Sequence, residues 1–145
     1  MLGCWNAGIK ERRKDKKCWN AGIKERKEAG ELRLEVGMRY TRFEDLPCWQ
    51  KARELCQAVF KLINKQCFWK DFSMKDQIWR AAGSSMDNIA EGFDDVSTKE
   101  FLKFLGYSLR SCSEVQSQLY RALDCDYISK DEFNITYELA GECRS

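Results

Sequence analysis

The sequence predicts an all-α protein in which four helices pack as a bundle. Four segments carry apolar residues three and four positions apart, a spacing that places them on one face of a helix. Signatures of helix starts precede several of these segments. Pro occurs once, at Pro47, so little in the chain interrupts long helices.

The first helix is expected at about 47–65. Pro47 suits its first turn, where the missing N–H would have no intrahelical acceptor. Its packing face follows the three-and-four spacing and comprises Trp49, Ala52, Cys56, Val59 and Ile63.

The second helix is expected at about 74–91. Ser73 with Asp76 resembles a capping box, and Gly92 suits the left-handed residue after a helix end. The packing face is rich in small residues, which let a neighbouring backbone approach closely: Ile78, Ala81, Ala82, Ser85 and Ile89. A polar flank beside it comprises Arg80, Ser84, Asp87, Asn88 and Glu91.

The third helix is expected at about 98–124, behind the capping pair Ser97 and Glu100. Its packing face comprises Phe101, Leu105, Ser108, Cys112, Val115, Leu119 and Ala122. A second apolar stripe, formed by Leu102, Leu109 and Leu123, indicates contacts on more than one side.

The fourth helix starts after Ser129, with Glu132 completing a capping box, and faces inward through Phe133, Tyr137 and Ala140. It has at most about 16 residues, or roughly 24 Å, against roughly 40 Å for the third helix. An antiparallel fourth helix would therefore cover the third only back to about Arg110. The apolar patch over residues 101–109 would need another subunit or the leader as cover, or this chain is a truncated copy.

Residues 1–37 form a basic leader, expected to be disordered or loosely helical, before a bundle at 38–145. CWNAGIKER occurs at 4–12 and again at 18–26. The leader holds 10 Lys/Arg and 6 Asp/Glu, whereas residues 38–145 hold 15 and 17. One interpretation is an arm that contacts RNA or a partner through two Trp residues and the cations Arg12, Arg13, Lys14, Lys16 and Lys17. The other, which we favour together with a disordered arm, is a duplicated DNA segment translated upstream of a start at Met38.

The composition disfavours the common catalytic and metal sites. The chain has no His, which removes the commonest general base and every Ser-His or Cys-His nucleophile. Its eight Cys form no CxxC pair, so we expect reduced structural thiols, no metal or cofactor, and a cytoplasmic protein. No run approaches the roughly 20 apolar residues of a membrane span.

Four motifs in order resemble a known family. They are RYTRFEDLPCWQKAREL (39–55), DQIWRAAGSSMDNIAEG (76–92), KEFLKFLGYSLRSCSEVQSQL (99–119) and ALDCDYIS (122–129). Together they resemble the four-helix-bundle proteins encoded in intervening sequences of bacterial 23S ribosomal RNA genes. The family motif RRAAxSIxxNIAEG is matched at Arg80, Ala81, Ala82, Ser84, Asn88, Ile89, Ala90, Glu91 and Gly92.

The resemblance implies an antiparallel up-down four-helix bundle that assembles as a ring, often a pentamer. It implies no catalytic residues, since the family has none that are recognised. The family is similar in fold to the accessory protein of diversity-generating retroelements, which works with a reverse transcriptase and nucleic acid. This chain departs from the family at Trp79, where a second basic residue is usual, and at Met86, where proline is common. Its short fourth helix and duplicated leader also depart from the family.

The sequence leaves three functions open. The leading hypothesis is a non-enzymatic, self-associating bundle that contacts RNA or DNA through the leader and Arg80, with Asn88 and Glu91 as interface candidates. The second is a protein–protein adaptor, such as an accessory subunit of a mobile-element reverse transcriptase. The third, which we disfavour, is an enzyme that uses carboxylates such as Asp87 and Glu91.

Overall fold

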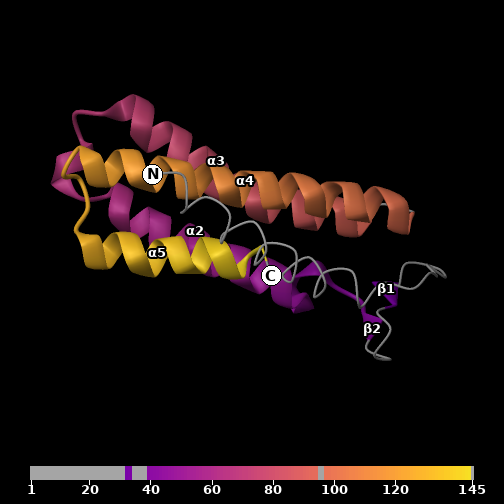
Figure 1. Cartoon of the computed structure of the whole chain (residues 1–145). Coiled ribbons are helices and arrows are strands. Elements are labelled where there is room, and N and C mark those ends of the chain that lie inside the picture. The colour runs from indigo at the N-terminus through magenta and orange to yellow at the C-terminus, as the bar shows by residue number, and fades with distance from the viewer. Residues whose placement is uncertain (1–31, 34–38, 95–96, 145) are drawn as a thin grey trace, which may run out of the picture.

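The computed structural model describes residues 32–33, 39–94 and 97–144. In this part of the chain, four α-helices pack side by side: α2 (Pro47–Ile63), α3 (Phe72–Asp94), α4 (Thr98–Asp124) and α5 (Lys130–Glu142) (Figure 1). Two short 3-10 helices, η1 (Phe43–Asp45) and η2 (Gln66–Phe68), precede α2 and α3. The predicted all-α four-helix bundle is confirmed.

A pair of short antiparallel strands precedes the helices and was not predicted. β1 (Leu32–Arg33) pairs with β2 (Arg39–Tyr40), with Leu32 opposite Tyr40. β1 lies within the predicted leader, whose character as a whole stays a prediction. The rest of the leader, residues 1–31 and 34–37, lies outside the described residues.

Contacts between side chains show that neighbouring helices run antiparallel. Arg121 on α4 donates to Gln77 on α3 at 3.2 Å, and Ser108 donates to the Ser85 carbonyl at 2.6 Å, so the two helices run in opposite directions. The opposite ends of α2 and α5 are joined by the ion pairs Lys65–Glu132 and Lys51–Glu142. The whole arrangement can be followed in Figure 1.

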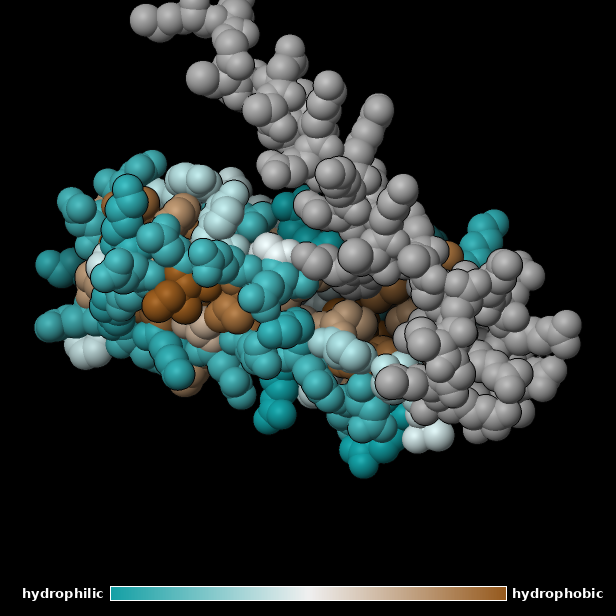
Figure 2. Space-filling model, turned by 60° about the horizontal axis from the view of Figure 1, so that its bottom comes forward, coloured by the Kyte–Doolittle hydropathy of each residue, from teal (hydrophilic) through white to brown (hydrophobic). Residues whose placement is uncertain are grey.

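The core contains every residue that the spacing pattern assigned to the packing faces of α2, α3 and α4. Phe133 and Ala140 of α5 are buried as well, and Tyr137 is half-buried. On the face drawn in Figure 2, the described surface is mostly hydrophilic, with hydrophobic side chains gathered in a few patches. Among the described helices, none is both long and apolar enough to cross a membrane.

Gly92 does not end its helix, so that prediction is wrong. α3 continues to Asp94, and Gly92 is buried inside it. A Cβ atom on Gly92 would lie 2.6 Å from the Phe104 Cβ and 3.1 Å from the Phe101 ring. The glycine is therefore needed because α4 passes close to the backbone of α3, rather than for a left-handed turn.

The start of α3 also differs from the prediction. The helix begins at Phe72, and the Asp71 side chain accepts the Met74 N–H at 2.9 Å. Asp71 therefore caps the helix, a role that the sequence assigned to Ser73. The expected partner Asp76 instead pairs with Arg80 on the surface of α3.

The starts of the other helices agree with the sequence. Ser97 accepts the Glu100 N–H at 3.2 Å ahead of α4. Ser129 and Glu132 form both hydrogen bonds of a capping box ahead of α5, at 3.2 and 2.8 Å. α2 begins at Pro47 as predicted.

The fourth helix covers only part of the third. Gln116 on α4 donates to the Tyr137 carbonyl at 3.2 Å, and Arg144 beyond the end of α5 donates to Gln116 at 3.0 Å. α5 therefore ends beside the middle of α4. The α4 packing face beyond this point is nevertheless buried, at Phe101 and Leu105. The apolar patch expected to lack cover spans residues 101–109. Within it, the residues of the second stripe, Leu102 and Leu109, reach the surface.

Candidate interaction surface

The polar flank predicted on α3 lines an open depression of about 810 Å³. Cys56 from α2 and Glu114 from α4 complete the lining. The structure therefore brings together the three bundle candidates, Arg80, Asn88 and Glu91, along one side of α3.

Asn88 is fixed by its own helix. Its side-chain amide donates to the Ser84 carbonyl at 2.6 Å and to the Ser84 hydroxyl at 3.0 Å. Ser111 of α4 donates to the same hydroxyl at 3.0 Å. Asn88 is therefore part of the contact between α3 and α4, with little donor capacity left for a ligand.

Arg80 is exposed and paired. Its guanidinium lies 2.5 Å from the Asp76 carboxylate, one turn earlier on α3. The hydrogen bond to Arg80 lowers the pKa of Asp76, and the same bond raises the pKa of Arg80. The pair partly offsets the positive charge of Arg80, whose side chain stays 77% exposed.

Three carboxylates dominate the remaining charge of the depression. Asp87 and Glu91 of α3 and Glu114 of α4 all line it, and all three residues are exposed. None of them forms an ion pair with another described residue. We call these three residues the acidic row. Their charge disfavours an anionic ligand.

An aromatic groove of about 360 Å³ lies between α2 and α3, next to the depression. We define the aromatic groove by its lining residues Ile63, Phe72, Lys75, Asp76 and Trp79, together with Phe60, whose ring lies 5.7 Å from that of Trp79. Trp79 also lines the depression, so the two hollows are neighbours on the surface.

The aromatic side chains of the groove are unusually exposed. Phe72 is 75%, Phe60 53% and Trp79 42% exposed. A cluster of exposed large aromatic residues marks an interaction surface more often than a solvated one. Trp79 departs from the family pattern, but the groove was not predictable from the sequence, because Phe60 and Phe72 lie off the packing faces.

The buried thiols differ in pKa, since the hydrogen bond with Cys143 lowers the pKa of Cys112. Cys56 donates to the Ala82 carbonyl at 3.0 Å, and burial raises its pKa to about 11. A hydrogen bond to Cys112, followed by burial, raises the pKa of Cys143. Protonated thiols are poor nucleophiles and poor metal ligands. Within the described residues, no cluster of three or more Cys, Asp or Glu is placed to bind a metal ion.

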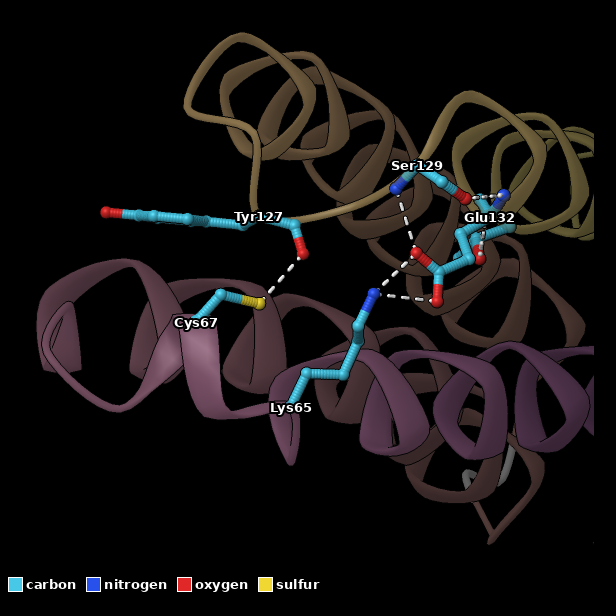
Figure 3. A network of polar contacts seen from close by, with 6 residues as sticks. Lys65, Cys67, Tyr127, Ser129 and Glu132 are labelled. Carbon is cyan, nitrogen blue, oxygen red and sulfur yellow. Dashed lines mark hydrogen bonds and ion pairs between the residues drawn. The ribbon is translucent and has the colours of Figure 1, made fainter.

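A polar network joins the two loops at one end of the bundle (Figure 3). Lys65 donates to both oxygens of the Glu132 carboxylate, at 2.9 and 2.7 Å. The Cys67 thiol donates to the Tyr127 carbonyl at 3.0 Å. The hydrogen bond from Lys65 is the main cause that lowers the pKa of Glu132, and the Ser129 N–H adds to it. This network fastens the start of α5 to the connection between α2 and α3.

The remaining predicted site residues lie outside the described part of the chain. They are the leader cations Arg12, Arg13, Lys14, Lys16 and Lys17.

Comparison with known proteins identifies the fold and the family. A crystal structure from Bacteroides thetaiotaomicron, of a protein with unknown function from the S23 ribosomal protein family, is similar with a TM-score of 0.61 and 24% identity. The match covers 67% of this chain and 91% of that one, and it supports the fold alone. No curated protein sequence matches the chain. The model of the 23S rRNA-intervening sequence protein family matches residues 44–145. The bundle of this chain thus belongs to the family of 23S rRNA-intervening sequence proteins.

Proposed function

We propose that this protein is a non-enzymatic helical bundle that associates with copies of itself and binds RNA or DNA through its basic leader. We propose that the copies assemble as a ring, such as the pentamer that the family resemblance implies. The first part of the proposal depends on α4 and the second on the leader.

The observation that supports self-association is a stripe on α4 beyond the end of α5. Leu102 is 44% exposed and Leu109 is half-buried, and the two lie about two turns apart on the same face of α4. Between them, a Cβ atom on Gly106 would meet nothing within 4 Å. A stripe of two leucines around a glycine allows another helix to approach the α4 backbone closely, since helix separation depends on the side chains at the contact.

Light scattering on the purified chain tests this part. We expect an oligomer at micromolar concentration. Leu102→Asp should shift it towards the monomer, because a charge would be buried in the new contact. Ile135→Asp is the matched control, since Ile135 is an exposed residue of α5 and lies off the stripe. A wild-type monomer, or equal effects of both substitutions, would contradict the assignment.

The leader is the better nucleic-acid candidate because its charge is concentrated. Five cations fall within residues 12–17, and Trp5 and Trp19 offer rings on which bases can stack. In the bundle, by contrast, Arg80 is paired with Asp76 and lies in a depression that the acidic row also lines. We therefore assign nucleic-acid binding to the leader and not to Arg80.

Filter binding with single-stranded RNA at increasing salt tests this part. If the five cations contact phosphates, the logarithm of the affinity should fall with log salt at a slope of about −3.5. Replacing all five by Ser should abolish most of the slope, whereas Arg80→Ala should leave it unchanged. The absence of affinity at low salt, or a dependence on Arg80 alone, would refute the assignment.

A further inference from the structure

We propose that a CWNAGIKER segment of the leader docks in the aromatic groove of its own chain, with its basic end over the acidic row. The proposed function leaves the groove and the duplication of the segment unused. The inference does not require self-association or nucleic-acid binding.

The apolar residues of the segment match the groove. Each copy places Trp and Ile four positions apart, at Trp5 and Ile9 and again at Trp19 and Ile23. The groove presents Phe60, Phe72 and Trp79 to solvent. A Trp ring can cover such side chains in offset or edge-to-face contact, which removes a large apolar area from water.

Apolar and charged residues follow one another in the same order along the segment and along α3. In each copy the apolar pair is followed by Lys and Arg, and in α3 the aromatic groove is followed by the acidic row. Trp79 and Asp87 are eight residues apart, or about 12 Å along a helix. Trp19 and Arg26 are seven residues apart, a span of about 10 Å in a helix and about 23 Å when extended. One segment can therefore contact both surfaces at once.

The length of the leader allows docking within one chain. Ile63 and Phe72 line the groove at the end of α2, so the groove lies about 25 Å, the length of α2, from the start of that helix. Because Leu32 pairs with Tyr40, the chain before Leu32 must span this distance, and between Trp19 and Leu32 it can extend up to about 43 Å. The copy at 18–26 reaches the groove most easily, and the identical copy at 4–12 can compete for it.

The charge of the acidic row favours the leader, and not the bundle of a second copy, as the occupant of the groove. The bundle from residue 38 carries 15 Lys/Arg and 17 Asp/Glu, so its net charge has the same sign as the acidic row. The leader carries 10 and 6, the opposite sign. Complementary charge favours the correct partner mainly by penalising like-charged ones.

Zero-length carbodiimide cross-linking of the full chain, mapped by mass spectrometry, tests the proposal. We expect leader lysines such as Lys10 and Lys24 to link to Asp87, Glu91 or Glu114. Replacing both Trp5 and Trp19 by Ser should reduce these links roughly tenfold, the effect of losing a buried aromatic anchor. Trp69→Ser is the matched control, because Trp69 is exposed but does not line the groove.

Two outcomes would overturn the proposal. The first is equal linking to carboxylates elsewhere, such as Glu54 and Glu138, or links that persist without Trp5 and Trp19. The second is linking between copies, which a mixture of ¹⁴N and ¹⁵N chains reveals, because it would place the segment on a neighbour. Light scattering of the same variants separates this result from self-association. If a variant loses the cross-links but keeps its oligomeric state, the loss reflects the docked segment and not the assembly.

Discussion

At the level of a single residue, Gly92 sets how closely α3 and α4 approach each other. Its missing Cβ leaves room for the Cβ of Phe104 and the ring of Phe101. The Cβ of Phe104 is bonded directly to the α4 backbone, so it can move away only if the helix moves. The glycine is thus a packing residue in the middle of a hydrogen-bonded helix.

Gly92→Ala should destabilise the bundle. Although alanine favours a helix by about 1 kcal/mol, the clash should lower the free energy of unfolding by about 1–3 kcal/mol. Urea denaturation followed by circular dichroism measures the change. Gly83→Ala on the same helix is the control: its Cβ would meet only the Asp87 carboxylate, at 4.0 Å. We expect that substitution to stabilise by about 0.5–1 kcal/mol. Equal effects at both positions would show that packing at Gly92 does not matter.

This residue also shows a limit of sequence reasoning. A glycine after a run of helix formers is typical of a helix end, and nothing local distinguishes that role from close packing. The distinction depends on Phe101 and Phe104, which lie on another helix. Asp71 was missed for a related reason: Ser73 offered an equally plausible cap, and only the turn after η2 places the Asp71 carboxylate near the Met74 N–H.

At the level of elements, the Glu132 side chain at the start of α5 makes two stabilising contacts. Glu132 accepts the Ser129 N–H as part of the capping box and pairs with Lys65 from the α2–α3 connection. The capping box was predicted from the local pattern. The ion pair could not be, since its partners are far apart in the chain and meet only when the loops pack together.

Glu132→Gln should reveal the charge-dependent part of this contact. Gln can still accept the Ser129 N–H, so the expected loss at pH 7 is modest, about 0.5–1 kcal/mol for a half-exposed pair. Because the folded state lowers the pKa of Glu132, its contribution is present above the unfolded pKa of about 4.3 and disappears as the pH falls through the folded pKa. Denaturation of both proteins between pH 3 and 7 should show the difference closing below about pH 4.

Glu138→Gln is the control for this prediction. Glu138 is exposed on the same helix and forms no ion pair with another described residue. Its substitution should leave the pH dependence unchanged. A constant difference between wild type and Glu132→Gln across the pH range would show that the charge on Glu132 contributes nothing.

At the scale of the whole molecule, the sequence predicted the helices and their buried faces well. Spacing identifies a buried face without any knowledge of the partner, because every helix in the bundle must bury one stripe. Surfaces made by two helices were not predictable in the same way. The aromatic groove needs Phe60 and Phe72 to meet Trp79, and the acidic row needs Glu114 beside Asp87. Phe60, Phe72 and Glu114 each look like an ordinary surface residue in their own helix.

The unequal lengths of α4 and α5 have a consequence for how the bundle opens. Figure 1 shows α3 and α4 extending together beyond the end of α5, and the polar network of Figure 3 fastens the opposite end. Local unfolding draws on the region with the fewest buried contacts. Amide hydrogen exchange should therefore be faster in the first turns of α4 than around Leu119, where α5 covers the helix. Uniform exchange along α4 would mean that the bundle opens only as a whole.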